Sequence, residues 1–457
     1  MFEIKLKRCP DGKHRSKKTR LCETFVPRPK KTVKRPRTKT KSKSKTNRNA
    51  VKIANFMKRT KHQRHGHFLK NICSDSGVCI AFGIESNKIK TFFNQFVAFD
   101  YVVAPITAIG APSANGFVKE LNYRHRNYVA NAILKSSVKP RADNLFYEYS
   151  VGLQINQWTK YFPCFVETYG LYTYKSPMRY GYVKNTKRIS DVSKLKDALT
   201  LVSTSNATNP VYNYADICQN SKYYAVLIQH IRNAKTMLQV ADKLEAKDQL
   251  ALLAQVYFPL GQLTHEFVHY DLHRENVMMY QPAKNKYIHF YYHFKDGSVV
   301  QFKSYYVAKI IDYGRSYIKD SVKIHDQICK TRECNPMCGT IFGFGWMEPN
   351  ITRDNYYISS INRNPSHDIR LFNLYFPTMV KYDKLYGTEP VYTTSSVRVS
   401  DPLFKIKNVM DASNYLKDFI VGRRSYYLDN AKFPKNKQFG ELHIYMDMSK
   451  PMRFVKT

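Results

Sequence analysis

Two polar motifs in the middle of the chain contain side chains suited to phosphoryl transfer. Asp271 and Asn276 lie five residues apart in HYDLHREN, and Asp312 follows in KIIDYG. Transfer of a phosphoryl group from a nucleotide uses one carboxylate to orient the attacking hydroxyl, and an amide oxygen with a second carboxylate to hold Mg²⁺. The order of these residues predicts Asp271 and Asn276 as catalytic residues, and Asn276 and Asp312 as Mg²⁺ ligands.

Hydrophobic patterning predicts the elements that must position these side chains. The apolar run LALLAQVYFPLGQL, residues 250–263, is typical of a helix that ends shortly before the first motif. Asp271 and Asn276 then fall on the loop after that helix. The run KIIDYG, residues 309–314, predicts a strand that ends close to Asp312.

The two motifs together resemble those of the protein-kinase superfamily. His269–Asn276 matches the catalytic-loop pattern H-x-D-L-x-x-x-N, and Asp312-Tyr-Gly314 matches D-F-G with Tyr in place of Phe. The chain is most similar to the divergent serine/threonine kinases of large nucleocytoplasmic DNA viruses. The stretches that carry this similarity are HYDLHRENVMMY, IIDYGRS, CNPMCGTIFGFGW and the basic leader with its C-P-x-G pattern.

The resemblance implies a fold, an activity and a set of partners. The fold is α+β and bilobal, with a small β-rich N-lobe and a larger helical C-lobe. The activity is transfer of the ATP γ-phosphate to a Ser or Thr hydroxyl of a protein substrate, with Mg²⁺ as the metal. The similarity to viral kinases implies a location in the cytoplasm or nucleus of an infected host cell, or in the virion.

Kinases also carry a Lys–Glu ion pair upstream of the catalytic loop, and this sequence offers one. Tyr128–Lys135 (YVANAILK) alternates like a strand and ends on Lys135. Asn144–Trp158 has helical spacing and contains Glu148. The resemblance implies that Lys135 contacts the α- and β-phosphates of ATP and that Glu148 is its partner.

A phosphate-binding hairpin and an adenine-binding hinge are expected from the same resemblance. In residues 109–118, IGAPSANGFV, Gly116-x-Val118 fits the end of the glycine-loop pattern and Gly110 allows a tight turn. Gly110, Gly116 and Val118 are therefore expected to bind the nucleotide. Other residues of this stretch, Ala111 and Ser113, stand where glycines are expected and weaken a close approach to phosphate. Residues 161–169 and 223–231 read as further strands, and Gln229 and Ile231 of the second should face the adenine.

The predicted organisation has four parts. They are a basic, largely disordered tail at 1–70, an N-lobe at 71–231 with a polar insertion at about 171–222, a C-lobe at 232–400, and a C-terminal extension at 401–457. In the C-lobe, Asp368 lies in SHDIRLF, a stretch that resembles the helix whose Asp anchors the catalytic loop in kinases. Asp368 is therefore interpreted as structural.

Departures from the kinase pattern leave two alternatives open. Tyr270 replaces the Arg that usually precedes the catalytic Asp, which predicts activity without a phosphorylated activation segment. His273 stands where serine/threonine kinases carry Lys, and D-L-H-x-x-N is also found in small-molecule phosphotransferases of the aminoglycoside and choline kinase type. The degraded glycine loop and the basic tail favour another alternative, a catalytically weak, kinase-like structural or nucleic-acid-associated virion protein.

The charge is unevenly distributed along the 457 residues. The chain has 74 Lys and Arg against 35 Asp and Glu, a net charge of +39, of which residues 1–70 hold +22. The segment 27–48 is rich in Lys, Arg, Thr, Ser and Pro and cannot bury enough surface to offset its ordering entropy. We expect residues 1–70 to bind nucleic acid or another polyanion without sequence preference. No signal sequence or membrane span is expected.

Cysteine usage raises one further hypothesis. Nine cysteines without a signal sequence favour reduced thiols. Four side chains of the types that bind zinc lie within fourteen residues and could hold a tetrahedral Zn²⁺: His325, Cys329, Cys334 and Cys338. Their spacings are not those of a standard zinc finger, so buried or free thiols are the favoured interpretation and zinc is the secondary one.

Overall fold

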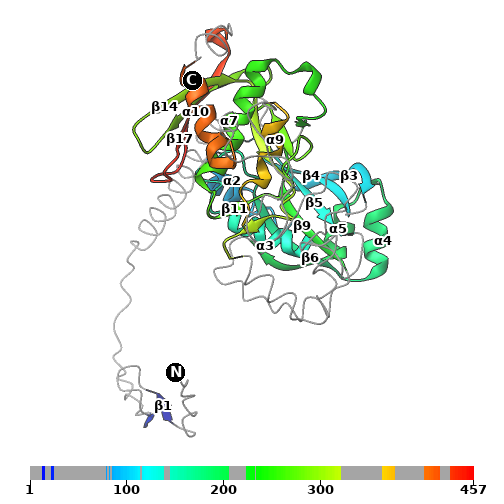
Figure 1. Cartoon of the computed structure of the whole chain (residues 1–457). Helices are drawn as coiled ribbons and strands as arrows, with labels where there is room; N and C mark the ends of the chain where they lie inside the picture. The colour runs from blue at the N-terminus through cyan, green and yellow to red at the C-terminus, as the bar shows by residue number, and fades with distance from the viewer. Residues whose placement is uncertain are drawn as a thin grey trace, which may run out of the picture. The chain divides into compact units, whose positions relative to one another are not determined.

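The computed structural model describes two compact units, Met1–Arg64 and His65–Thr457 (Figure 1). The described residues are 13–15, 22–24, 79, 82, 85–113, 116–137, 145–204, 223–231, 233–320, 363–375, 406–422 and 433–457. In the first unit, β1 (Lys13–Arg15) pairs antiparallel with β2 (Cys22–Thr24). The rest of the predicted basic tail, including the low-complexity segment 27–48, lies outside the described residues.

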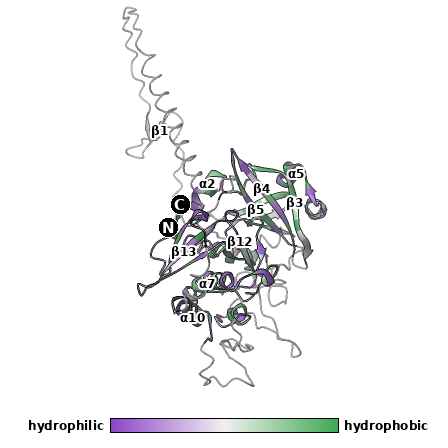
Figure 2. Ribbon diagram, turned by 90° about the horizontal axis from the view of Figure 1, so that it is seen from above, coloured by the Kyte–Doolittle hydropathy of each residue, from purple (hydrophilic) through white to green (hydrophobic). Residues whose placement is uncertain are grey.

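The second unit is a mixed α+β structure built on a seven-stranded antiparallel sheet, which confirms the predicted fold class at this level. The strand order is β7-β3-β4-β5-β9-β6-β8. The bounds are β3 Val102–Ser113, β4 Gly116–His125, β5 Tyr128–Ser136, β6 Thr168–Tyr174, β7 Arg188–Ile189, β8 Leu199–Thr204 and β9 Tyr224–Gln229. Along β4 and β5 buried and partly exposed side chains alternate, as the period of two requires. Figure 2 colours both strands by the hydropathy of their residues.

This sheet separates two hydrophobic cores. Ala225 and Leu227 of β9 enter one core, whereas Tyr224 and Val226 enter the other, because successive side chains of a strand point to opposite faces. Residues of α2 (Glu85–Phe92), α4 (Pro177–Asn185) and α5 (Val192–Ala198) share the first core. Residues of α3 (Leu145–Ile155) and α7 (Ala246–Gln262) share the second.

The predicted polar insertion at about 171–222 is folded over residues 171–204, so it is not one long loop there. This stretch contains α4, β7, α5 and β8, and β8 pairs with β6 while β7 pairs with β3. Three fully buried side chains attach it to the sheet core: Val183, Leu195 and Ala198. Ser176 caps α4 by accepting from the Arg179 N–H, and Asp191 caps α5 by accepting from the Ser193 N–H. These elements therefore need few apolar residues, because helix caps and strand pairing also stabilise them.

The predicted strand at 161–169 is also wrong over most of its length. Within this stretch Phe165 forms a single parallel bridge with Ile310, and β6 begins only at Thr168. Phe162, Cys164 and Phe165 are instead buried in the second core, so their apolar character reflects core packing.

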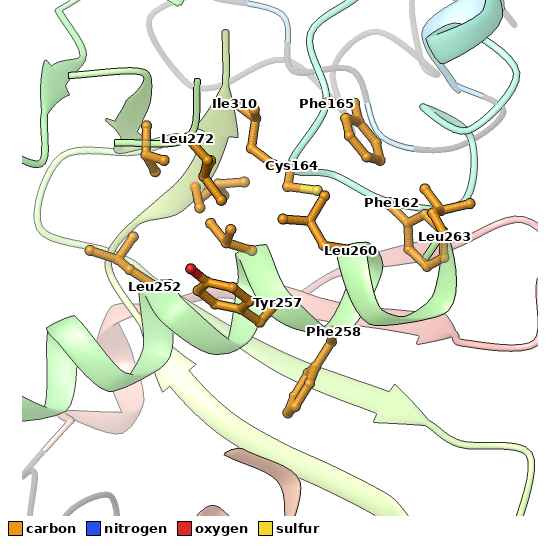
Figure 3. Packing of buried hydrophobic residues seen from close by; sticks show 14 of the residues in the cluster. Phe162, Cys164, Phe165, Leu252, Tyr257, Phe258, Leu260, Leu263, Leu272 and Ile310 are labelled. Carbon is orange, nitrogen blue, oxygen red and sulfur yellow. The ribbon is translucent and has the colours of Figure 1, made fainter. Parts of the chain in front are cut away.

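The second core is centred on α7, whose residues from Leu250 to Gly261 are all buried. Figure 3 shows side chains of α7 facing Phe162, Cys164 and Ile310 from other elements. Gly261 permits close packing against α10 (Val409–Gly422), because a Cβ there would lie 2.6 Å from Cβ of Ser413. The helix predicted before the catalytic motif is thus present and mostly buried.

The C-terminal residues form part of a second, four-stranded sheet with order β14-β13-β17-β18. The strands are β13 Tyr287–His293, β14 Val299–Ser304, β17 Gln438–Tyr445 and β18 Arg453–Lys456. β17 runs parallel to β13, and β18 is antiparallel to β17. The region predicted as an extension at 401–457 therefore contributes α10, β17 and β18 to the folded unit.

Short elements complete the described part of the chain. Two small sheets are formed by β10 (Lys235–Thr236), β12 (Val277–Tyr280) and β15 (Val307–Ile310), and by β11 (Phe267–Val268) and β16 (Tyr317–Ile318). The short helices are η1 Ala241–Lys243, η3 His367–Ile369, α9 Arg370–Asn373 and η4 Lys435–Lys437. Among the helices described, none combines the length and apolar character needed to cross a membrane.

The described cysteines differ from one another in state. Cys79 is disulfide-bonded, which corrects the expectation of reduced thiols at this position. Cys164 is a buried free thiol, and burial raises its pKa to about 12. An odd number of cysteines leaves at least one unpaired but does not decide the state of the others.

Candidate functional site

Lys135 is the meeting point of three elements. Its ammonium lies 2.6 Å from Glu148 Oε2 and 3.0 Å from Asp312 Oδ1. Lys135 is near the end of β5, Glu148 is in the first turn of α3, and Asp312 follows β15. The structure thus brings together three of the residues predicted for nucleotide and metal binding, across 177 positions of sequence.

The electrostatics of this triad favour the charged forms of Lys135 and Asp312. Burial alone lowers the pKa of Lys135, but the charges of Asp312 and Glu148 outweigh it, and the net pKa of Lys135 lies above its ordinary value. The charge of Lys135 in turn lowers the pKa of Asp312, although burial opposes that effect. Asp312 is the most exposed of the three, at 42% of its side chain, compared with 6% for Glu148. Glu148 is therefore the buried anchor, and Asp312 faces outward.

The loop that carries Asp271 is held by a buried carboxylate. Asp368 accepts hydrogen bonds from the backbone N–H of His269, at 2.6 Å, and of Tyr270, at 2.8 Å. Tyr270 has a φ of 63°, a left-handed conformation in which a non-glycine residue needs such support. Burial raises the pKa of Asp368 to about 7, against the effect of the two backbone donors. These contacts match the structural role predicted for Asp368.

His269 fixes the same loop from its other side. Its Nε2 donates to the carbonyl oxygen of Ile311, at 2.9 Å, and its Nδ1 accepts from the backbone N–H of Asp271, at 3.2 Å. These partners select the neutral tautomer with the proton on Nε2. Burial lowers the pKa of His269, in agreement with that assignment. The imidazole thereby links the Asp271 motif to the Asp312 motif.

Core packing fixes the two motifs at their bases. Leu272 follows Asp271 and Ile310 precedes Asp312 by two residues, and both side chains are fully buried in the second core (Figure 3). Because these apolar neighbours are held in the core, the side chains of Asp271 and Asp312 remain at its margin.

Asn276 and Asp312 lie at one end of the β12–β15 pair. Val277 is paired with Ile310, and the backbone N–H of Ile311 donates to the carbonyl oxygen of Asn276, at 3.0 Å. Asn276 Nδ2 donates to the carbonyl oxygen of Asp271, at 2.9 Å. This bond engages the nitrogen of the amide, so Oδ1 is the atom that could bind a metal ion.

Three basic side chains surround the Asp271 carboxylate. Arg315 Nη1 lies 3.8 Å from Oδ2, while Arg370 Nη1 lies 3.8 Å and His273 Nε2 3.7 Å from Oδ1. Arg315 and Arg370 are functional candidates that the sequence motifs did not indicate. A signal was present, since Arg315 directly follows D-Y-G and Arg370 stands two residues after Asp368.

The predicted glycine hairpin is formed by β3 and β4. Gly110 has a φ of 67° and Gly116 a φ of 150°, both in the range that favours glycine. A Cβ on Gly116 would clash with the carbonyl oxygen of Ser136, so close packing against β5 also requires glycine there. Val118 is opposite Lys135 in the β4–β5 register, which places the hairpin beside the Lys135 triad.

The predicted hinge residues lie at the end of β9, the strand next to β5, and just after it. Gln229 ends β9 and is paired with Ala132 of β5, while its side-chain oxygen accepts from the backbone N–H of Glu167, at 3.4 Å. Ile231 is buried. An adenine contact by Gln229 and Ile231 stays a prediction.

The zinc hypothesis falls outside the described residues, because His325, Cys329, Cys334 and Cys338 all lie there. Within the described ranges, no group of three or more His, Cys, Asp or Glu side chains is arranged to hold a metal ion. The predicted Mg²⁺ site of Asp312 and Asn276 contains only one such side chain, so it would rely on other oxygen donors.

Comparison with known proteins gives no match: no family model matches this sequence, and no match is found among the curated proteins. The function proposed below therefore depends on the residues and contacts of this chain alone.

Proposed function

We propose that this protein is an ATP- and Mg²⁺-dependent phosphotransferase with a bilobal, kinase-like fold that phosphorylates Ser or Thr hydroxyls of proteins. The observation that carries the proposal is the double contact of Lys135 with Glu148 and Asp312. In phosphoryl transfer by kinases, a Lys–Glu pair and a metal-binding Asp must be in place together. In this chain one ammonium joins both carboxylates.

The donor set suits Mg²⁺. Asp312 supplies carboxylate oxygens from a partly exposed side chain, and Asn276 supplies an amide oxygen whose orientation is fixed by the Asp271 carbonyl. Mg²⁺ prefers such hard oxygen ligands and completes its shell with water and phosphate oxygens. Bound between these residues and ATP, Mg²⁺ would neutralise charge on the phosphates.

The protein groups then have distinct tasks. Lys135 binds phosphate oxygens of ATP, and Glu148 orients Lys135. Asp271 accepts a hydrogen bond from the acceptor hydroxyl and takes its proton as the oxygen attacks the γ-phosphorus. The bond from the acceptor oxygen to phosphorus forms while the bond from phosphorus to the β,γ-bridging oxygen breaks, and ADP leaves with that electron pair.

The proposal is tested by comparing Asp312→Asn with wild type and with Asp242→Asn, a control at an exposed position of η1. ATP hydrolysis and autophosphorylation in the presence of Mg²⁺ should fall by about 100-fold or more in Asp312→Asn only. Equal activity of Asp312→Asn and wild type would remove the metal assignment. A wild-type protein that neither binds nor hydrolyses ATP would overturn the proposed function.

One observation favours a second candidate, a small-molecule phosphotransferase. His273 Nε2 lies 3.1 Å from Asn276 Nδ2 and 3.7 Å from Asp271 Oδ1, so the residue that departs from the protein-kinase pattern is part of the site. Phosphorylation of a basic and an acidic test protein, followed by phosphoamino-acid analysis, separates the candidates, because a small-molecule enzyme should label neither.

A further inference from the structure

The ring of Tyr313, which directly follows Asp312, is buried beside the segment that leads to Asp271. Tyr313 is 4% exposed. Its ring meets those of Phe267 and His269 edge to face, with centroids 6.4 and 6.1 Å away. A phenylalanine could fill this space equally well, so packing accounts for the aromatic ring and leaves the hydroxyl group to be explained.

The hydroxyl group of Tyr313 forms two hydrogen bonds with the backbone. It donates to the carbonyl oxygen of Ile310, at 2.8 Å, and accepts from the backbone N–H of Val166, at 2.9 Å. Burial raises the pKa of Tyr313, so the hydroxyl keeps its proton and can donate at physiological pH. A phenylalanine at this position could form neither bond and would leave the buried N–H of Val166 without this acceptor.

The first of these bonds spans Asp312. It links the side chain of the residue after Asp312 to the backbone of Ile310, two positions before it. The backbone of Asp312 has a φ of 68°, a left-handed conformation that is uncommon for a residue other than glycine. Because Tyr313 is the next residue, a backbone rotation that turned Asp312 away from Lys135 would pull the hydroxyl from its partners.

The buried segment 164–166 gives the hydroxyl a fixed partner. The carbonyl oxygen of Cys164 accepts from the backbone N–H of Ile310, at 2.7 Å, and Phe165 forms a parallel bridge with the same residue. Val166 then provides the N–H that donates to the tyrosine hydroxyl. Three successive residues of this segment therefore hold the chain at the D-Y-G motif.

We propose that the Tyr313 hydroxyl is a positioning group, which keeps the Asp312 carboxylate facing Lys135 and the site of Mg²⁺. This inference rests on the proposed function, since it assumes that Asp312 binds the metal ion. With the carboxylate held in this orientation, Mg²⁺ binding needs no rearrangement of the motif. Without the hydroxyl, other orientations of Asp312 gain population, and the apparent affinity for Mg²⁺ falls with the fraction that remains competent.

Tyr313→Phe keeps the ring and removes both hydrogen bonds. The Mg²⁺ concentration that gives half-maximal ATP hydrolysis should rise by about three- to tenfold, while kcat at saturating Mg²⁺ stays within about twofold of wild type. Excess Mg²⁺ restores the rate because it selects the competent orientation. An unchanged Mg²⁺ dependence, or a loss of kcat that excess Mg²⁺ does not restore, overturns the inference.

The matched control is Tyr123→Phe. It removes another buried hydroxyl, which donates to the carbonyl oxygen of Phe96 at 2.6 Å in the first core. A general loss of stability would affect both variants alike, whereas a positioning role affects Tyr313→Phe alone. The Mg²⁺ dependence of Tyr123→Phe should therefore equal that of wild type, and an equal shift in both variants overturns the inference.

Combination with Asp312→Asn shows whether the hydroxyl acts through Asp312. With Mg²⁺ present, adding Tyr313→Phe to wild type should raise the dissociation constant of ATP by about three- to tenfold, but adding it to Asp312→Asn by less than about twofold. Equal factors in both backgrounds overturn the inference, since the hydroxyl would then act on the nucleotide independently of Asp312.

Hydrogen exchange tests the same role without activity or bound nucleotide. Three backbone N–H groups around Asp312 have carbonyl acceptors: those of Ile310, Ile311 and Ser316. They should exchange about fivefold or more faster in Tyr313→Phe, and at the wild-type rate in Tyr123→Phe. Unchanged exchange, or faster exchange confined to Val166, overturns the inference. A wild type that neither binds nor hydrolyses ATP overturns the proposed function, and the exchange rates then still show whether the hydroxyl fixes the motif.

Discussion

Lys135 Nζ lies 2.6 Å from Glu148 Oε2, and this contact fastens the end of β5 to the first turn of α3. Glu148 is almost fully buried, so its charge is tolerated only because the ammonium accompanies it. The pair is therefore both a structural link and the support of a proposed phosphate contact.

Glu148→Gln keeps the shape of the side chain but removes its charge. Lys135 retains Asp312, so we expect a loss of about 2 kcal/mol in the free energy of unfolding, less than for a buried ion left with no partner. Urea denaturation measures it. Glu245→Gln is the control, because Glu245 is 69% exposed beside Lys247 and should change stability by less than about 1 kcal/mol. Equal effects of the two substitutions would contradict the proposed anchoring role.

Gly116→Ala tests the packing of the β3–β4 hairpin on β5. The added Cβ meets the Ser136 carbonyl oxygen at a φ of 150°, so we expect a loss of about 1–3 kcal/mol. Gly181→Ala is the matched control, since Gly181 lies within α4 with open space around it and should gain about 0.5–1 kcal/mol. A thermal unfolding series that ranks the two variants in the opposite order would refute the close approach at Gly116.

Asp368 is expected to determine the stability of the loop that carries Asp271. Asp368→Ala leaves two buried backbone N–H groups without their acceptor, which should cost about 2–4 kcal/mol. Asp368→Asn keeps one acceptor and should fall between wild type and the alanine variant. For comparison, Asp447→Ala removes an exposed contact to the Ser449 N–H and should cost less than about 1 kcal/mol. If both Asp368 variants unfolded like wild type, Asp368 would not anchor the loop through two hydrogen bonds.

The buried imidazole of His269 predicts a loss of stability in acid. Its pKa in the native state lies below the ordinary value of 6.5, so below about pH 6.5 the unfolded chain binds a proton that the native protein does not. The contribution of His269 to the free energy of unfolding should therefore fall as the pH drops from 7.5 to 5.5. His367 and His293, whose pKa values are also lowered by burial, contribute in the same direction. Asp368, whose pKa is raised to about 7, contributes in the opposite direction over this range.

The contribution of His269 is isolated by His269→Gln. Glutamine retains a donor for the Ile311 carbonyl but does not titrate, so its stability should vary less with pH than that of wild type. Urea denaturation at several pH values measures the difference in slope. Parallel pH profiles of the two proteins would show that His269 titrates normally in the native state.

Local patterns predicted the elements with continuous apolar spacing. The helix expected at 144–158 is observed as Leu145–Ile155, and the helix expected at 250–263 is observed as α7, Ala246–Gln262. Both helices present apolar side chains to a core along their length, so burial and periodicity agree. The strand with Lys135 was predictable for the same reason.

Long-range relationships could not be predicted in this way. Arg315 and Arg370 stand close to predicted motifs, but their approach to Asp271 depends on the path of the chain and not on a local pattern. The elements of residues 177–204 were hidden because caps and strand partners stabilise them more than apolar spacing does. The parallel pairing of β13 with β17 depends on partners about 150 residues apart.

The position of β17 between β13 and β18 has a consequence for synthesis on the ribosome. Tyr287 of β13 and Gln438 of β17 are 151 residues apart, so at 5–20 residues per second the nascent chain waits roughly 8–30 s for its partner strand. During that interval one edge of β13, with its Tyr and Phe side chains, has no neighbour in the sheet and is open to aggregation. In cells with limited chaperone capacity, the protein should therefore aggregate at this stage. Such aggregation would precede any effect of a substitution in the Lys135 site.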